Sequence, residues 1–383
     1  MSDFLSLIIE KLVPGGEGLA RHEGCVVFVP GVLPGEEVRA EIVETKKDFA
    51  RAELRQILRP SPDRITPPCP LAGTCGGCDW LHIHPTAQGR LKIEIARDAF
   101  RRMGGFEWPG LRIETGSPIA YRNRLQVHVG DSGALGFLER RGHGFVPVQH
   151  CPVAHPAFAP LFQKGAAPGA PERFHAFALS DANRKSHLWR EDESPHAEAS
   201  VTILGRELVF PVSGFFQSNL EMVEHLVPYA LQGLAGDTVL DLYSGVGLFA
   251  AFLKDHFRRV VCVESGREAL KFAARNVGSE KGVFLPGQLE HLTEQADLPL
   301  SWEQPDAAVV DPPREGLDVR VRAWLKEKSI PKLVYVSCNP VTLARDLKDL
   351  LAGPYALEDL RLFDFYPQTS HIEAVAKLKL KKI

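Results

Sequence analysis

The amino-acid sequence predicts an α/β protein with a doubly wound C-terminal domain, preceded by a small β-barrel and a central α+β domain. Three observations support this division. Short β-branched runs fill residues 1–58, Pro and Cys interrupt the chain from residue 59, and apolar strands alternate with helices over residues 213–383. A chain of 383 residues, 44% of them hydrophobic, is long enough to bury two or three separate cores.

The N-terminal segment, residues 1–58, has the pattern of a five-stranded barrel. Runs such as CVVFVPGV and EEVRAEIVE are broken by Gly and Pro, as expected for short strands joined by tight turns. Barrels of this size commonly bind nucleic acids, but they also serve as inert spacers. The pattern by itself therefore leaves RNA binding open.

The central segment, residues 59–212, begins irregularly because prolines remove backbone donors and restrict their neighbours. Residues 86–103 are predicted to form a helix, and residues 110–213 to alternate short strands with turns. Residues 163–200 have low apolar content and no clear period, so we expect a long loop or a loosely ordered insertion there.

Charge and hydropathy limit the classes of protein. No run approaches the roughly 18 apolar residues of a membrane helix, and the start lacks a signal-peptide plan, so we expect a cytoplasmic protein. The formal charge of −3 at pH 7 neither favours nor excludes a polyanionic partner. The local clusters of arginines are equally compatible with solvent-exposed surface charge and with contacts to phosphates. No obligate protein partner is evident, and a monomer is the default.

Seven cysteines in a long chain without a secretory signal indicate metal binding or catalysis rather than disulfides. Cys25 and Cys262 lie within apolar strands and are predicted to pack in cores. Four thiolates can hold zinc or an iron–sulfur cluster, and a close trio with one distant thiol favours the cluster. The candidate ligands are Cys69, Cys75, Cys78 and Cys151.

A glycine turn follows the apolar strand in VLDLYSGVG. Gly245 and Gly247 would let a ligand approach the backbone, because glycine has no Cβ and a helix N-terminus offers free N–H groups. The next strand ends in Glu264, about 20 residues further on, where a carboxylate can accept hydrogen bonds from ribose hydroxyls. A nicotinamide dehydrogenase, a nucleoside-cofactor methyltransferase and a cofactor-free turn all remain compatible.

Two later strands end in side chains of chemical interest. Asp311 begins the stiff loop DPPR, which is more typical of methyltransferases acting on nucleic acids than of dehydrogenases. Cys338 ends its strand before Asn-Pro, so it would face the same edge of the sheet, where a thiolate can act as a nucleophile.

Methylation of carbon 5 of uracil would need such a thiolate. Its addition at carbon 6 makes carbon 5 nucleophilic, and a base must later remove the proton from carbon 5. His371 and Glu373 lie two residues apart and would share one strand face, so either side chain can supply this base.

In combination, these motifs resemble those of the RNA uracil-5 methyltransferases, which act on ribosomal or transfer RNA. The resemblance covers nearly the whole chain and rests on QSN, DLYSGVG, DPPREGL, YVSCNPVTLARDL and FYPQTSHIE, in that order. It implies a Rossmann-like S-adenosylmethionine methyltransferase domain. VPGGEGLAR and VVFVPGVLPGEEV resemble the TRAM domain, an OB-like RNA-binding barrel.

The resemblance also implies residue roles. Cys338 would be the nucleophile, Glu373 the base, Arg314 an organiser of the sheet edge, and the four clustered cysteines the ligands of a 4Fe-4S cluster. RNA is the implied partner, with ribosomal RNA preferred over transfer RNA because of the barrel. Cofactor binding is implied for Gln217, Tyr243, Gly245, Gly247, Glu264, Gln288 and Asp311.

Two alternatives remain compatible with the residues. An amino-group methyltransferase would use Asp311-Pro312-Pro313 directly, and Cys338 would then be structural. A non-catalytic RNA-binding protein with an iron–sulfur or zinc site would not bind S-adenosylmethionine.

Overall fold

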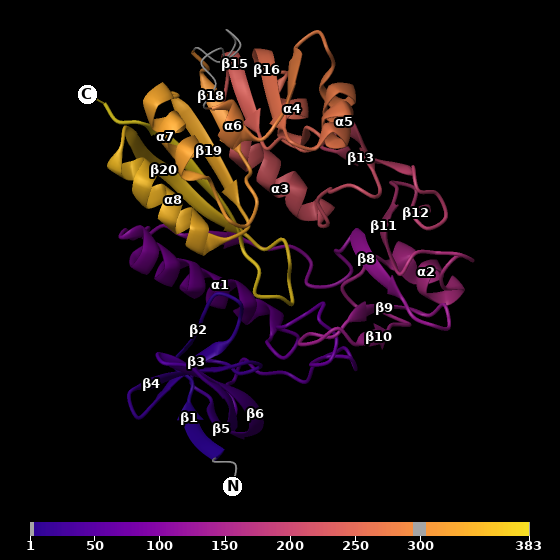
Figure 1. Cartoon of the computed structure of the whole chain (residues 1–383), viewed down its shortest axis with the longest axis vertical. Coiled ribbons are helices and arrows are strands. Elements are labelled where there is room, and N and C mark those ends of the chain that lie inside the picture. Colours follow the sequence, from indigo (N-terminus) through magenta and orange to yellow (C-terminus); the bar gives the residue numbers. More distant parts are fainter. Residues whose placement is uncertain (1–3, 294–303, 383) are drawn as a thin grey trace.

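The computed structural model describes residues 4–293 and 304–382. The ends of the first and third predicted domains, residues 1–3 and 383, lie outside this range. Figure 1 shows the described chain as an N-terminal group of strands, a central sheet and a large C-terminal sheet covered by helices. No helix in the described part of the chain is long and apolar enough to cross a membrane.

The N-terminal strands form one six-stranded sheet in the order β1-β5-β6-β4-β3-β2. One more strand is present than the five predicted, because the two-residue strand β2 pairs with β3. Cys25 packs against the buried core of this sheet, as predicted. The strands are β1 (Phe4–Ile8), β2 (Lys11–Leu12), β3 (Gly18–His22), β4 (Cys25–Val29), β5 (Glu37–Thr45) and β6 (Phe49–Arg59).

The predicted central helix is confirmed as α1 (Pro85–Ala99), which continues into the π-helical turn Phe100–Gly104. The helix begins where His84 accepts a hydrogen bond from the Thr86 amide and Pro85 occupies the first turn. In Figure 1, α1 lies between the N-terminal strands and the C-terminal sheet. Its buried residues, including Leu91 and Ile95, pack into a C-terminal core.

The central sheet has five strands in the order β10-β9-β8-β11-β12, and a separate hairpin follows it. The short helices Pro156–Phe158 and α2 (Ala159–Lys164) precede β11. The sheet strands are β8 (Arg124–Val129), β9 (Leu135–Leu138), β10 (Phe145–Pro147), β11 (Arg173–Ser180) and β12 (Ser186–Arg190). The hairpin strands are β13 (Glu198–Ile203) and β14 (Arg206–Pro211).

The expectation of a loop over residues 163–200 was wrong, because β11 and β12 pair within that segment. Phe174 and Phe177 of β11 are buried, so the few apolar residues of the segment are concentrated in one strand. The Asp181 carboxylate accepts hydrogen bonds from the Asn183 and Lys185 amides, which closes the turn between the strands. The polar turn residues lower the apolar content of the segment, so its sequence showed no strand period.

The C-terminal sheet has eight strands in the order β17-β16-β15-β18-β19-β21-β20-β7. Strands β15 to β19 are parallel, while β21 runs antiparallel between β19 and β20. The eighth strand comes from the first half of the chain. The strands are β7 (Arg112–Glu114), β15 (Gly236–Leu242), β16 (Phe257–Glu264), β17 (Gly282–Pro286), β18 (Ala307–Val310), β19 (Lys332–Ser337), β20 (Tyr355–Phe363) and β21 (Glu373–Leu380).

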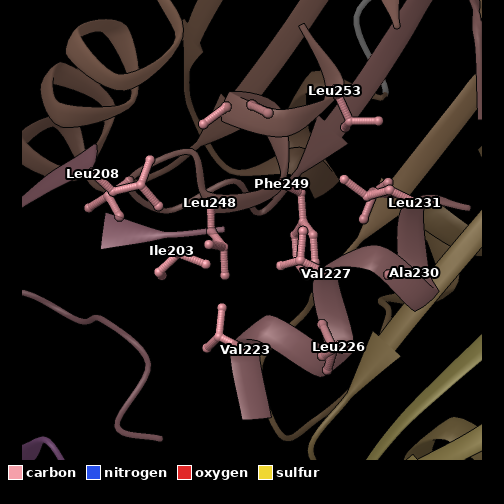
Figure 2. Close-up of a cluster of buried hydrophobic side chains, with 14 of the residues drawn as sticks. Ile203, Leu208, Val223, Leu226, Val227, Ala230, Leu231, Leu248, Phe249 and Leu253 are labelled. Carbon is pink, nitrogen blue, oxygen red and sulfur yellow. The ribbon is translucent and has the colours of Figure 1, made fainter. Parts of the chain in front are cut away.

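Helices bury both faces of this sheet. Successive residues of β15, Val239 and Leu240, belong to opposite cores, as expected for a strand covered on both sides. Figure 2 shows α3 and α4 side chains in one core, with Phe249 beside Val227. Cys262 is fully buried there, as predicted. The helices are α3 (Leu220–Leu231), α4 (Leu248–Leu253), α5 (Arg267–Val277), α6 (Leu289–Leu292), α7 (Val319–Lys328) and α8 (Pro340–Ala352).

The strand order reverses between β15 and β18. From β15 the chain proceeds outward to β16 and β17, then returns to place β18 and β19 on the other side. Such a reversal leaves a crevice at the carboxyl ends of the strands, where ligands bind in doubly wound sheets. The fold therefore places a binding site beside the glycine turn and Asp311.

Candidate active site

A cavity of about 1230 Å³ opens at this reversal point. Its wall combines the turns that follow several parallel strands with segments from before α3 and from the start of β21. Gly247 does not line it, but Arg314 and His371 do. The cavity brings together eight of the predicted site residues: Gln217, Tyr243, Gly245, Glu264, Gln288, Asp311, Cys338 and Glu373.

The glycine turn after β15 has a left-handed backbone at both of its glycines. Gly245 and Gly247 have φ angles of +53° and +81°, and Gly247 begins α4. A Cβ at Gly247 would lie 3.1 Å from the Cα of Ala273, so a larger residue would separate α4 from α5. Gly247 therefore allows the turn to pack closely against α5, while Gly245 lies in the cavity wall.

Glu264 is fixed as a hydrogen-bond acceptor at the end of β16. One carboxylate oxygen accepts from the Gly245 amide at 3.0 Å, and the other accepts from the Gly266 amide at 2.6 Å. Two backbone donors hold the carboxylate in one orientation in the cavity wall. The remaining lone pairs of the Glu264 carboxylate can accept hydrogen bonds from a pair of ligand hydroxyls.

The adjoining wall is built from three segments that are distant in sequence. The Tyr243 hydroxyl donates to Glu290 at 2.9 Å, and Gln288 precedes the first turn of α6. Gln217 lies just before Asn219, whose side chain caps α3 by accepting from the Met222 amide.

Phe215 also lines the cavity, with 66% of its surface exposed. Phe215 is not among the site residues predicted from the sequence. An apolar aromatic that begins the segment FFQSN was the available signal, and its exposure is evident only in the fold.

The Cys338 turn is fastened to the Asp311 loop. The Asn339 side chain caps α8 by accepting from the Val341 amide, and it donates to the Arg314 carbonyl at 3.1 Å. The Thr342 hydroxyl donates to the same carbonyl. These contacts hold the thiol at the carboxyl end of β19 and directly before a helix N-terminus.

Three acidic groups share the inner end of the cavity. Burial, together with the charges of Glu373 and Asp311, raises the pKa of Cys338 to about 11. Burial raises the pKa of Asp311 to about 7 and, together with the Asp311 charge, raises the pKa of Glu373 well above its ordinary range. A cationic ligand beside these groups would favour their charged forms and thereby lower the pKa of the thiol.

The two candidate bases differ in burial. Glu373 begins β21 with 9% of its surface exposed, whereas His371 precedes the strand and is exposed. Both side chains line the cavity. Its buried position favours Glu373 as a group whose proton affinity is tuned by the site.

The four clustered cysteines are neighbours in the central region. Burial, together with the charges of the three other thiols, raises the pKa of Cys78 to about 12. Backbone amides donate to two of these sulfurs, from Gly77 to Cys75 and from Ala154 to Cys151. Among the residues that the structure describes, no three His, Cys, Asp or Glu side chains converge on a site for one metal ion.

Comparisons with known proteins agree on one family. Residues 291–381 match the family model described as tRNA (Uracil-5-)-methyltransferase, and residues 5–54 match the TRAM domain. An uncharacterized RNA methyltransferase of Treponema denticola is 33% identical, over 96% of each chain. A 23S rRNA (uracil(1939)-C(5))-methyltransferase of Pectobacterium atrosepticum is 31% identical over 97% of this chain and 93% of its own.

One solved structure has the same fold over nearly its whole length. The tRNA (uracil-54, C5)-methyltransferase of Pyrococcus abyssi, crystallised with S-adenosyl-L-homocysteine, aligns with a TM-score of 0.75 at 23% identity. The alignment covers 98% of this chain and 100% of that chain.

Proposed function

The chain belongs to the RNA uracil-5 methyltransferase family, and we propose that it methylates carbon 5 of a uridine by nucleophilic catalysis through Cys338. The observation that carries this proposal is the presence of Cys338, Asp311 and Glu373 in the wall of one cavity. The amino-group and non-catalytic alternatives lose support, because the named relatives act on carbon 5 of uracil.

The cavity offers the donors and acceptors that S-adenosylmethionine requires. Glu264, held by two backbone amides, would accept hydrogen bonds from the ribose hydroxyls. Gly245 lets the cofactor approach the backbone, and Tyr243, Gln217 and Gln288 would contact the rest of it. Asp311 would place a carboxylate beside the positive charge of the cofactor. When bound, S-adenosylmethionine supplies an electrophilic methyl group.

Cys338 would begin the reaction by adding its sulfur to carbon 6 of the uracil. Its position before the α8 N-terminus favours the thiolate, as does the positive charge of Arg314. The negative charge that develops on the ring makes carbon 5 a nucleophile, which takes up the methyl group. Addition to carbon 6 requires the base to leave its stack, because both reacting carbons must enter the cavity.

Glu373 would complete the reaction by taking the proton from carbon 5. Burial and the Asp311 charge raise its pKa, which increases its affinity for that proton. As the proton leaves, the double bond between carbons 5 and 6 re-forms and the Cys338 thiolate is expelled. Arg314, which lines the cavity, limits the repulsion among the acidic groups.

We also propose that Cys69, Cys75, Cys78 and Cys151 hold a 4Fe-4S cluster. Their mutual charge effects indicate four neighbouring thiols, and amide donors to two sulfurs suit bound thiolates. Zinc would draw four sulfurs to about 2.3 Å from one point, whereas a cluster binds each sulfur at a different iron and keeps the sulfurs further apart. The close trio of cysteines with one distant thiol in the sequence favours the cluster over zinc.

The cluster proposal predicts a brown protein with about four irons per chain. Metal analysis and the visible spectrum of anaerobically purified protein test this directly. Cys78→Ser should abolish the colour, whereas Cys25→Ser, in the barrel core, should retain it. A colourless protein with one zinc per chain would contradict the assignment.

The preferred substrate is 23S ribosomal RNA. The rRNA-modifying relative matches over nearly the whole chain, including a barrel that matches the TRAM domain. We assign RNA contacts to residues 1–58 and to parts of residues 59–212, with methyl transfer in residues 213–383. The resemblance in fold to a tRNA-modifying enzyme makes transfer RNA the substrate to test beside it.

Transfer of labelled methyl groups to unmodified ribosomal and transfer RNA, in separate reactions, tests the proposed function. We expect 5-methyluridine in ribosomal RNA and a loss on the order of 10³-fold or more with Cys338→Ala. Cys25→Ala is the matched control and should retain activity. Label on an amino group, or transfer that survives Cys338→Ala, would show that Cys338 is not the nucleophile.

A further inference from the structure

The loop that connects β20 to β21 is held by residues from the first half of the chain. This loop, residues 364–372, leads directly into Glu373. Figure 1 shows it in yellow, extending from the C-terminal sheet toward the N-terminal half. Contacts from α1 and from the segment that follows Cys78 hold this loop, and the Tyr121 hydroxyl also donates to its Pro367 carbonyl at 3.0 Å.

Gln88 of α1 binds the middle of the loop through both ends of its amide. Its nitrogen donates to the Gln368 side-chain oxygen at 2.9 Å, and its oxygen accepts from the Gln368 backbone amide at 2.8 Å. The Trp80 amide donates to the Gln368 carbonyl at 2.9 Å. Gln88 is 1% exposed, so water does not compete for these bonds.

Gln368 has an uncommon backbone conformation, with a φ angle of +65°. A residue with a Cβ adopts this left-handed region at an energetic cost and keeps it only where surrounding contacts determine it. The bonds from Gln88 and Trp80 supply such contacts. Without them, the loop would relax to a different path into β21.

Asp79 binds the loop closer to the base. One of its carboxylate oxygens accepts from the Ser370 amide at 2.9 Å. Ser370 lies three residues before Glu373, and the next amide, that of His371, donates to the Thr369 hydroxyl. Asp79 therefore fixes the backbone just before the chain enters β21.

We propose that Asp79 and Gln88 are positioning residues for the removal of the proton from carbon 5. This inference rests on the proposed function. In that step the bond from carbon 5 to hydrogen breaks, the Glu373 carboxylate takes the proton, and the electron pair forms the bond between carbons 5 and 6. The bond from carbon 6 to the Cys338 sulfur breaks, and its electrons return to the sulfur.

The two halves of the reaction depend on different contacts. Cys338 is held by the bonds from Asn339 and Thr342 to Arg314, which lie within the C-terminal sheet. Glu373 depends on the loop that Asp79 and Gln88 hold. Loss of these anchors should spare sulfur addition and methyl uptake but delay proton removal, so the covalent enzyme–RNA adduct should accumulate.

The experiment compares Asp79→Ala and Gln88→Leu with the full-length wild-type enzyme, using substrate RNA and labelled S-adenosylmethionine. A misplaced base should lower turnover about 10- to 100-fold. The fraction of RNA in a denaturant-stable adduct should rise severalfold above that of the wild type. Asp79→Asn keeps an oxygen that can accept from Ser370, so it should recover most of the turnover.

Asp63→Ala is the matched control. Asp63 precedes the same cysteine segment and pairs with Arg90 of α1 at 2.5 Å, so its loss removes a similar carboxylate from the same region. We expect wild-type turnover and wild-type adduct levels. Iron content and binding of S-adenosylhomocysteine are measured for every variant. Gln88 belongs to α1 and not to the cysteine segment, so Gln88→Leu decides the result if Asp79→Ala loses iron.

Glu373→Gln separates a failure of this inference from a failure of the proposed function. If Glu373→Gln forms no lasting adduct, Glu373 is not the base and the proposed mechanism is wrong. If Glu373→Gln accumulates the adduct while both anchor variants turn over normally, the positioning proposal is wrong. Equal impairment of Asp79→Asn and Asp79→Ala would likewise overturn the hydrogen-bond role of Asp79.

Discussion

The proposed cofactor side and the proposed base side of the cavity are built in different ways. On the proposed cofactor side, Gly245 follows β15 and donates its amide to Glu264, the last residue of the neighbouring parallel strand β16. On the base side, the loop before Glu373 is held by Gln88 and Asp79, which lie 280 and 291 positions from their partners. One side is local to the sheet, and the other exists only when both halves of the chain have assembled.

Because of this difference, substitutions on the two sides should change different properties of the protein. A substitution on the cofactor side should change ligand affinity and leave the fold intact. A substitution on the base side should affect both the assembly of the two halves and the chemistry. The following three predictions test this contrast in order of expected effect.

The largest effect is expected from Lys92→Met. Lys92 is fully buried, and its ammonium group lies 2.6 Å from the carboxylate of Asp364. Asp364 is the first residue of the loop 364–372 that leads to Glu373. Removal of Lys92 leaves a buried carboxylate unpaired, so the free energy of unfolding should fall by about 3–5 kcal/mol. Denaturant titration measures this change. Lys11→Met, which breaks the partly exposed pair with Asp98, should cost less than about 1 kcal/mol.

An equal loss of unfolding free energy in Lys92→Met and Lys11→Met would contradict the difference between the two sides of the cavity. It would mean that the Lys92 pair contributes no more than a surface contact. The base side would then be no more dependent on long-range assembly than the rest of the molecule.

A smaller effect is expected from Glu264→Gln on the cofactor side. Hydrogen bonds to a charged acceptor contribute roughly 1.5–3 kcal/mol, so the Kd for S-adenosylhomocysteine should rise about 10-fold or more. Isothermal titration measures the affinity, and the unfolding midpoint should change little. Glu268→Gln, which removes an exposed partner of Lys271, is the control. Unchanged affinity in Glu264→Gln would mean that Glu264 does not bind the ribose.

The smallest effect concerns the thiol that lies between the two sides. The charge of Asp311 raises the pKa of Cys338, so Asp311→Asn should lower that pKa. Alkylation of Cys338 at pH 9, followed by mass spectrometry, should then be severalfold faster. Asp318→Asn removes a carboxylate paired with Arg320 and should leave the rate unchanged. Slower alkylation in Asp311→Asn would have the wrong sign for charge repulsion.

The sequence could predict that the residues of the proposed cofactor side meet in one cavity, because the signals for their positions are local. A strand, a glycine turn and an acidic residue after the next strand recur at fixed spacing, and each shows in a short stretch of residues. The positions of Asp311 and Cys338 followed from the same rule about strand ends. The cavity brings these residues together as that rule requires.

The base side could not be predicted in the same way. Gln88 looks like an ordinary helix residue, and Asp79 looks like part of a cysteine loop. Their partners are backbone amides, which no residue type signals. Similarly, β11 and β12 were missed because a short polar hairpin has neither a long apolar run nor a regular period. Long-range hydrogen bonds and short strands are determined by the assembled fold.

Strand β7 ties the order of synthesis to the finished sheet. Glu114 is made 247 residues before Arg361, with which it pairs when β7 joins β20. During synthesis, the edge strand β7 is therefore present long before the rest of the sheet with which it pairs. A fragment beginning near residue 213 would leave the backbone of β20 open to other molecules, which favours aggregation. The first half of this protein thus covers the sheet edge that the second half would otherwise leave unpaired.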